Sequence, residues 1–296
     1  MAVPTIAEAI NTYLDDCQAR NLRPASLITY RRHLGDFLRF TQDAGLTRVE
    51  QLDTPILRRY FAGLQARGMA PASIRSHGRV LRIFLNFCVA DGIVSETPMQ
   101  RGRVRMPRQD KPAPDTFTAA EVQQLIKAVR TRRDRAIVLC LLDTGCRVGE
   151  FTAWRRSDID AAGRVTLRAE TTKTHATRFV FLGKRSHTAL TRYLDEMRPR
   201  DRVWLGERSP HTPLTVDGMK RAIQRIGAQA GVKPAGPHRY RRTFATVALA
   251  RGMNIYDLAA IMGHKRIDQL KQYLRQDAGT LAAAHARYSP VDHLLK

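Results

Sequence analysis

Residues 143–154 read "DTGCRVGEFTAW" and place a glycine, an arginine and a glutamate within one short stretch. Arg147 stands at the expected start of a helix that continues toward Trp154, and Gly145 beside it indicates a close approach of backbone. An isolated arginine at a helix start is usually a surface residue. Glu150 follows one helical turn later, so we expect it to orient neighbouring groups. The role of this stretch can be interpreted only together with other stretches of the chain.

Three other stretches carry polar residues in similarly specific places. "TTKTHA" at 171–176 puts Lys173 at the tip of a predicted hairpin, between "GRVTLRAE" and "TRFVFLG". "PHRYRRTFAT" at 237–246 puts His238 and Arg241 three residues apart, on one face of a predicted helix. "IMGHKRIDQLKQY" at 261–273 puts His264 at a helix end and Tyr273 nine residues later.

The first third of the chain predicts a small helical bundle. Thr5 and Glu8 form a capping box, and the helices that follow begin near the prolines of "RPASLITY", "TPILRRYF" and "PASIRSHG". They end near glycines, the last at Gly92. The predicted outer faces carry Arg31, Arg32, Arg75, Arg79 and Arg82.

Residues 99–116 lack apolar periodicity and hold three prolines and five basic residues, which is typical of an extended basic linker. A second capping box at Thr118 and Glu121 restarts ordered structure. We therefore predict a helical domain at 1–98, a linker at 99–116 and a mixed domain at 117–296. The second domain should hold the hairpin and helices around 186–197, 216–228, 238–250, 255–262, 266–274 and 279–287. The predicted fold class is mostly α with a small β-hairpin.

The charge indicates a polyanionic partner. Fifty Lys and Arg against 27 Asp and Glu give a net charge of +23. Residues 1–108 hold 16 arginines and 9 acidic residues, so both parts of the chain carry an excess of positive charge. The longest apolar run, 136–142, is too short for a membrane span, and the N-terminus lacks the pattern of a secretory signal. The four cysteines show no C-x-x-C spacing, so we expect buried, reduced thiols in a cytoplasmic protein.

Read together, the four stretches resemble the tyrosine recombinases, the phage integrase family, over nearly the whole chain. The family pattern is an arginine in a TG-x-R-x-x-E box, a hairpin lysine, an H-x-x-R box, a GH box and a tyrosine nine residues beyond. The matching residues are Thr144, Gly145, Arg147, Glu150, Lys173, His238, Arg241, Gly263, His264 and Tyr273. One position departs from the pattern: Arg242 stands where many members carry a second histidine.

The resemblance implies a mechanism without metal or nucleotide. Tyr273 would attack a DNA phosphate, giving a 3′-phosphotyrosyl link and a free 5′-hydroxyl. Arg147 and Arg241 would meet the charge of the transition state, since guanidiniums present rigid planar forks. Lys173 would protonate the leaving oxygen. Of the two histidines, His238 would assist deprotonation of the tyrosine, and His264 would bond a phosphate oxygen.

Each of these residues has a competing interpretation. Tyr273 taken alone would be a packing residue, and Tyr288 is a rival phenol that fits no family spacing. Lys173 has rivals in Lys184, Lys220 and Lys233, none of which lies in the hairpin turn. His238 and His264 have no His or Cys partner at metal-site spacing, so we expect no metal.

The resemblance also implies partners and architecture. The N-terminal bundle would be a SAM-like core-binding domain, joined to an α+β catalytic domain. Double-stranded DNA sites would be the partner, bound by a tetramer without a cofactor or a membrane. Residues 279–296 would dock onto a neighbouring protomer. Candidate DNA contacts are Arg31, Arg32, Arg75, Arg79, Arg82, Arg103 and Arg105.

Two other functions fit the same residues. A non-catalytic DNA-binding regulator would keep the fold and use its basic surfaces only, and a type IB topoisomerase would share the chemistry but act as a monomer without strand exchange. The sequence leaves open the target site, any accessory protein and the biological role among integration, excision, dimer resolution and transposition. It also leaves open whether the tyrosine acts in its own protomer's site.

Overall fold

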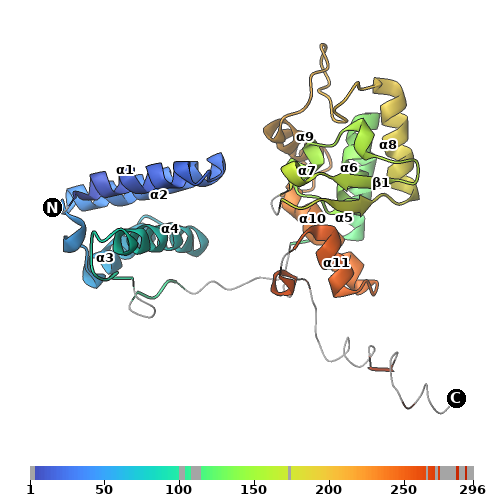
Figure 1. Cartoon of the computed structure of the whole chain (residues 1–296). Helices are drawn as coiled ribbons and strands as arrows, with labels where there is room; N and C mark the ends of the chain where they lie inside the picture. Colours follow the sequence, from blue (N-terminus) through green and yellow to red (C-terminus); the bar gives the residue numbers. More distant parts are fainter. Residues whose placement is uncertain are drawn as a thin grey trace. The chain divides into compact units, whose positions relative to one another are not determined.

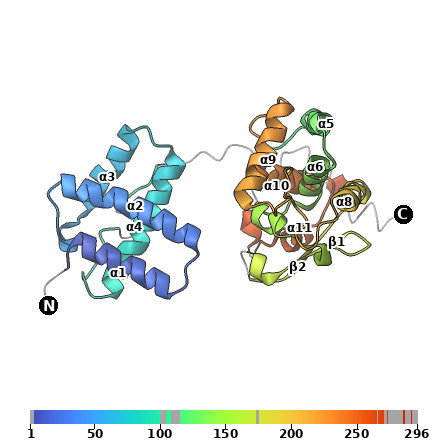
Figure 2. The same cartoon turned by 90° about the horizontal axis from the view of Figure 1, so that it is seen from above.

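The computed structural model describes residues 4–99, 104–107, 115–172, 175–264, 266–270, 273, 285–286 and 291. The chain divides into two compact units, Met1–Lys111 and Pro112–Lys296 (Figures 1 and 2). The division falls inside the segment 99–116. The separate roles of the domains at 1–98 and 117–296 stay a prediction.

The N-terminal unit is a helical bundle, as predicted. Thr5 opens the first helix with a capping box, because its hydroxyl accepts from the Glu8 N–H while the Glu8 carboxylate accepts from the Thr5 N–H at 2.7 Å. A proline stands in the first turn of each later helix. The elements are α1 (Ile6–Ala19), α2 (Pro24–Asp43), the 3₁₀ turn η1 (Val49–Gln51), α3 (Thr54–Ala66) and α4 (Pro71–Ala90).

Aromatic side chains fill the core of this unit. The ring of Tyr13 packs edge-on against Phe84, and Phe37 packs edge-on against Tyr60 with 5.0 Å between ring centroids. All four side chains are at most 2% exposed. Because these side chains bury one face of α2 and of α4, the opposite faces are exposed to solvent, and the arginines of both helices lie on them.

The C-terminal unit is built around one buried helix, α6. Five of its residues, from Ala136 to Leu141, are fully buried, and it packs against α8, α9 and α10. Figure 1 shows it among these helices. The helices are α5 (Ala119–Ala128), α6 (Arg132–Thr144), α7 (Val148–Thr152), α8 (Lys184–Met197), α9 (Val216–Gln229), α10 (Pro237–Ala250) and α11 (Ile255–Met262).

The predicted hairpin is confirmed. Strands β1 (Arg164–Leu167) and β2 (Arg178–Phe181) pair antiparallel, with Val165 opposite Val180 and Leu167 opposite Arg178. Short 3₁₀ turns flank β1, η2 (Arg156–Asp158) before it and η3 (Ala169–Thr171) after it. Both valines are fully buried, so one face of the hairpin belongs to the core of the unit.

The prediction that an α-helix begins at residue 266 and runs to 274 is wrong at its start. The chain there forms the 3₁₀ turn η4 (Ile267–Gln269), in which Leu270 donates to the carbonyl of Ile267. Tyr273 in turn donates to the carbonyl of Leu270 at 2.8 Å. Bonds of this i to i+3 kind define a 3₁₀ turn, and no side chain caps its first residue. The helix predicted at 279–287 lies almost wholly outside the described residues.

The predicted fold class is confirmed: the chain is mostly helical with one small hairpin. All four cysteines are buried and free, as predicted. Within the described ranges, none of the helices combines the length and the apolar character that crossing a bilayer requires.

Candidate active site

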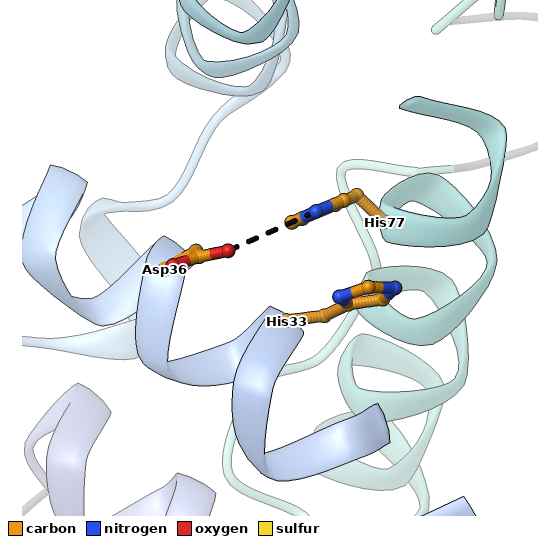
Figure 3. A group of neighbouring side chains, drawn as sticks. All are labelled: His33, Asp36 and His77. Atoms are coloured by element: carbon orange, nitrogen blue, oxygen red, sulfur yellow. Dashed lines mark ion pairs between the residues drawn. The ribbon is translucent and has the colours of Figure 1, made fainter. Parts of the chain in front are cut away.

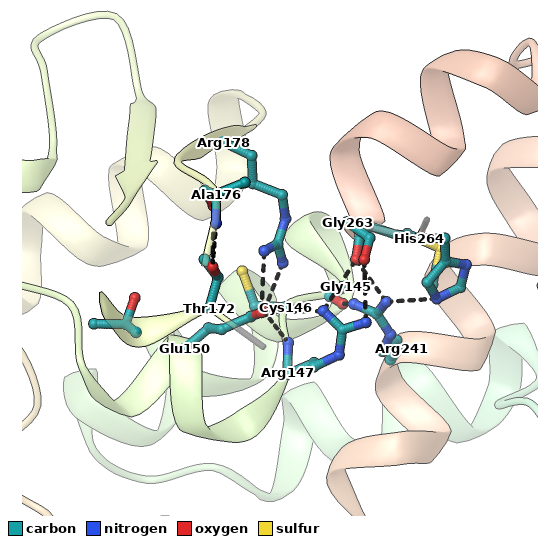
Figure 4. A network of polar contacts seen from close by, with 12 residues as sticks. Gly145, Cys146, Arg147, Glu150, Thr172, Ala176, Arg178, Arg241, Gly263 and His264 are labelled. Atoms are coloured by element: carbon teal, nitrogen blue, oxygen red, sulfur yellow. Dashed lines mark hydrogen bonds and ion pairs between the residues drawn. The ribbon is translucent and has the colours of Figure 1, made fainter. Parts of the chain in front are cut away.

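Two arginines from distant parts of the chain meet in the C-terminal unit (Figure 4). Arg147 is the N-cap of α7, and Arg241 lies in the second turn of α10. The Arg241 guanidinium donates to the carbonyls of Gly145 and Met262, each at 2.7 Å, and Arg147 reaches the carbonyls of Met262 at 3.4 Å and Gly263 at 3.3 Å. The predicted pair of guanidiniums is thus brought together by helix ends.

The acceptors are the carboxyl ends of two helices, α6 and α11. Both helices end in a left-handed glycine, Gly145 with φ 56° and Gly263 with φ 63°. A side chain at Gly145 would place its Cβ 2.4 Å from Phe244, and one at Gly263 would lie 2.9 Å from the guanidinium carbon of Arg178. Glycine is therefore needed twice, for the backbone turn and for space. The negative ends of the two helix dipoles stabilise the cations between them.

Glu150 links this pair to the hairpin. Its buried carboxylate accepts from the backbone and the side chain of Arg147, at 3.0 and 3.1 Å, and from both terminal nitrogens of Arg178, at 3.0 and 2.6 Å. Burial raises the pKa of Glu150, but the bonds and charges of Arg178 and Arg147 outweigh it and hold the pKa below its usual value. Glu150 is thus ionised, and it bonds both the backbone and the guanidinium of Arg147.

Arg178 is a site residue that the sequence did not identify. It stands at the start of β2, shares the inward face with Val180, and donates through Nε to the carbonyl of Ile261 at 2.9 Å. One side chain therefore ties the hairpin, α7 and the end of α11 together. The feature of the sequence that could have identified Arg178 is a charged residue on the inward face of a half-buried strand.

His264 follows Gly263 and completes the cluster. Its Nε2 lies 2.9 Å from Nη2 of Arg241, and since arginine can only donate, Nε2 accepts and the ring proton is on Nδ1. That Nδ1 is buried without a partner among the described residues. Burial, followed by the charges of Arg241, Arg147 and Arg178, lowers the pKa of His264 to about 4. The imidazole is therefore neutral and has one N–H donor to offer.

His238 lies in the first turn of α10, one turn before Arg241. The residue is exposed. Partial burial of the ring, followed by the charges of Arg242, Arg241 and Arg147, lowers its pKa below the usual value. This histidine is therefore neutral near pH 7 and able to accept a proton.

Tyr273 packs in an apolar cluster beside the arginines. The residue is 8% exposed and shares the cluster with Ala245 of α10 and with Leu258 and Met262 of α11. Its hydroxyl makes no hydrogen bond to a described residue. Met262 connects the two environments, because its side chain belongs to the cluster and its carbonyl binds both guanidiniums.

The remaining predicted residues fall into two groups. Lys173 and Arg103 lie outside the described residues, as do Tyr288 and nearly all of 279–296. The arginines at 31, 32, 75, 79, 82 and 105 are exposed, the first five on α2 and α4. Their exposure leaves them available to a partner.

The arrangement suits an oxyanion. The guanidiniums of Arg147 and Arg178 pair with the Glu150 carboxylate, and that of Arg241 lies next to Arg147, so the cluster carries a charge of +2 while its histidines are neutral. Bonds to described residues account for three of the five N–H groups of Arg147 and three of those of Arg241. The spare donors can bind phosphate oxygens. A donor set of guanidiniums cannot hold a metal cation.

Two family models match the chain. The phage integrase family model matches residues 115–279, and the phage integrase N-terminal SAM-like domain model matches residues 10–93. Among relatives, the tyrosine recombinase XerC of Oceanobacillus iheyensis is 26% identical over 298 residues, with 95% of each chain covered. The tyrosine recombinase XerA of Saccharolobus solfataricus is 30% identical over 153 residues, which span 52% of this chain and 49% of the relative.

Solved structures share the fold. The Tn1549 transposon integrase in complex with a circular intermediate DNA superposes with a TM-score of 0.79 at 16% identity, covering 94% of this chain and 98% of that one. A lambda integrase tetramer bound to a Holliday junction gives a TM-score of 0.72 at 18% identity, with coverages of 88% and 78%. At these identities the likeness concerns the fold alone.

Proposed function

Since the chain belongs to the phage integrase family, the family of the tyrosine recombinases, we propose that it cuts and rejoins DNA at specific sites, with Tyr273 as its nucleophile. The relatives named tyrosine recombinase support the reaction class. The observation that carries the proposal is the meeting of Arg147, Arg241 and His264 in one cationic cluster. A phosphodiester is the anion that a DNA-binding chain of net charge +23 would bring there.

Each step uses a residue of this chain. The Oη of Tyr273 forms a bond to phosphorus as the bond to the 5′-oxygen breaks, and the spare N–H groups of Arg147 and Arg241 hold the non-bridging oxygens. His238 takes the phenolic proton, and Lys173 gives a proton to the leaving 5′-oxygen. A 5′-hydroxyl of a second strand then reverses the step.

The burial of Tyr273 sets a condition on this reaction. Because the residue is only 8% exposed, either the phosphate must reach the edge of the apolar cluster or the ring must turn out of it. Met262 stands between the cluster and the guanidiniums, so the displacement required is local. The Nδ1 N–H of His264 has no partner among the described residues, so it is the group that would bond a phosphate oxygen.

The N-terminal bundle would grip the DNA duplex through the exposed arginines of α2 and α4. Phosphate contacts position a protein on DNA without reading sequence, so these residues account for affinity and not for the choice of site. A tetramer on two DNA sites is the proposed working assembly, supported by the lambda integrase tetramer among the structures of similar fold. The cytoplasm is the proposed location.

A nicked suicide substrate tests the proposal. The wild-type chain is first used to select bound fragments from a random DNA pool, and the protected segment is rebuilt with a nick that lets the cleaved product diffuse away. We expect a covalent adduct at the 3′ end in the wild type and none in Tyr273→Phe. Tyr256→Phe, which alters an exposed tyrosine of α11, should keep the adduct.

The other outcomes separate the competing functions. An adduct that persists in Tyr273→Phe and disappears in Tyr288→Phe would move the nucleophile to the rival phenol. Tight binding with no adduct in any variant would indicate a non-catalytic regulator. Relaxation of a supercoiled plasmid lacking the selected site would indicate a topoisomerase.

A further inference from the structure

A second cluster of titratable side chains lies in the N-terminal unit, away from the proposed chemistry. His33 and Asp36 stand one turn apart on α2, and His77 faces them from α4 (Figure 3). One nitrogen or oxygen of each lies within 4.8 Å of those of the other two. The imidazole rings are stacked with centroids 3.9 Å apart.

The outer atoms of the three side chains already have partners. Nε2 of His33 lies 3.1 Å from the Ser76 hydroxyl, and Nδ1 of His77 lies 2.8 Å from the Tyr60 hydroxyl. Oδ1 of Asp36 accepts from Arg39. Histidines that bind a metal through one nitrogen characteristically donate the other N–H to such a group, which fixes the tautomer and the ring plane.

The remaining three atoms, Nδ1 of His33, Nε2 of His77 and Oδ2 of Asp36, are the candidate metal ligands. Nδ1 of His33, on a residue that is 4% exposed, has no partner in the described part of the chain. Nε2 of His77 lies 3.8 Å from Oδ2 of Asp36, too far for a hydrogen bond. Two ligands on a tetrahedral zinc ion are about 3.3 Å apart, given metal–ligand bonds of about 2.0–2.1 Å. Because the two rings are stacked with their planes only 19° apart, both imidazoles would have to turn before their lone pairs point at one ion.

We propose that His33, Asp36 and His77 form a binding site for a divalent transition-metal ion, with Zn²⁺ as the best match. Two imidazole nitrogens and one carboxylate oxygen are ligands that zinc accepts, and a water molecule would complete the four ligands. The ion would join α2 to α4, the two helices whose exposed arginines are the proposed DNA contacts. Its role would be to hold those two faces in one arrangement.

A cavity borders one of the three proposed ligands. It has a volume of about 290 Å³, opens beside α2 and α3, and is lined by Asp36, Asp43 and Tyr60 together with Arg39 and Arg67. The two arginines balance the charge of the two carboxylates, and Tyr60 is the residue that bonds His77. A metal site needs an entry path as well as its ligands.

No short sequence motif contains this site, so it could not be predicted from residue spacing. His33 and Asp36 alone are a pair at helical spacing, and His77 is 41 positions beyond Asp36. The expectation that the chain holds no metal considered His238 and His264 and their neighbours. Packing of α2 against α4 is what brings the third ligand in.

The test is metal titration of the full chain after removal of metals with a chelator. Isothermal titration with ZnCl₂ should show one ion per chain with a dissociation constant in the micromolar range or below. Co²⁺ should add visible ligand-field bands without the charge-transfer band of thiolate ligation. His33→Gln and Asp36→Asn should each weaken Zn²⁺ binding at least 100-fold and 10-fold, respectively. His211→Gln, at an exposed histidine outside the cluster, should bind as the wild type does.

Two further measurements keep the test decisive if a ligand variant folds poorly. Zn²⁺ should raise the melting temperature of the wild type in a concentration-dependent way, since an ion that binds only the folded state stabilises it. Tyr60→Phe, which removes one outer partner, should weaken binding about 10-fold. The site is wrong if the wild type takes up less than one tenth of an equivalent of Zn²⁺. It is equally wrong if His33→Gln and Asp36→Asn bind as tightly as His211→Gln.

Discussion

Arg147 and Arg241 donate to one and the same acceptor, the carbonyl oxygen of Met262, at 3.4 and 2.7 Å. The two residues are 94 positions apart in the sequence, and the shared oxygen holds their guanidiniums close enough to bind a single phosphate. The geometry is fixed before DNA arrives, so little reorganisation is needed when charge develops in the transition state.

Replacing either of these arginines by lysine should stop the chemistry and spare DNA binding. Arg241→Lys keeps the charge but loses the fork that reaches Gly145, Met262 and His264 together. We expect cleavage of a suicide substrate to slow about 100-fold or more. Affinity for the same DNA should change by less than about threefold, since other basic residues supply most of it.

Arg132→Lys is the matched control, because Arg132 forms an exposed ion pair with Glu196 and lies outside the cluster. Its cleavage rate should equal that of the wild type. Unimpaired cleavage in both Arg147→Lys and Arg241→Lys would show that the shared acceptor has no part in the reaction.

A methyl group at Gly145 should destabilise the fold more than one at an unconfined glycine. Gly145→Ala combines a left-handed backbone with a Cβ only 2.4 Å from the ring of Phe244. We expect a loss of about 2–4 kcal/mol in the free energy of unfolding. Gly45 has a similar φ of 69° but nothing within 4 Å of its Cβ, so Gly45→Ala should cost about 1–2 kcal/mol.

Urea denaturation at pH 7 measures both losses. The difference between the two variants reports the contact with Phe244, because the backbone cost is common to them. Equal losses would mean that Phe244 moves aside freely.

Local signals in the sequence predicted the elements well. Thr5, Thr118 and the prolines at helix starts mark positions where one residue decides the local backbone; the structure has capping boxes at the two threonines and helix starts at the prolines. Alternation around Val165 and Val180 predicted the hairpin, since one face of each strand must be buried. The 3₁₀ turn within 266–274 was not predicted, because a stretch of polar residues with a few apolar ones fits a 3₁₀ turn as well as an α-helix.

The site could be predicted only in part, for a related reason. Arg147, Arg241 and His264 lie in recognisable motifs, and the structure brings them together. Arg178 lies in no motif, and its contacts with Glu150 and Ile261 span 28 and 83 positions. Contacts over such distances follow from packing of elements, which residue spacing alone does not specify.

Removing the Arg178 side chain should destabilise the chain through Glu150. The Glu150 carboxylate is 2% exposed and receives two bonds from Arg178, so Arg178→Met leaves a buried charge with one partner fewer. We expect a loss of about 3 kcal/mol in the free energy of unfolding. Glu150→Gln in the same background should cost less than it does alone, giving a coupling energy of about 1–3 kcal/mol.

An exposed pair supplies the comparison for this cycle. Arg20 and Asp16 form an ion pair whose side chains are 64% and 33% exposed, and Arg20→Met should leave the free energy of unfolding almost unchanged. Additive losses for Arg178→Met and Glu150→Gln would show that the two side chains act independently.

The neutral state of His264 should make stability fall as the solution becomes acidic. Its pKa is about 4 in the folded chain, because of burial first and then of the charges of Arg241, Arg147 and Arg178, which Glu150 opposes only in part, and about 6.5 when unfolded. The unfolded chain therefore binds more protons between these values, so stability is fully present above pH 6.5 and is lost as pH falls toward 4. His264→Gln removes this contribution. The difference in unfolding free energy between wild type and variant should shrink steadily from pH 7 to pH 4.5, and a difference that stays constant would mean that His264 has the same pKa in the folded chain as in the unfolded one.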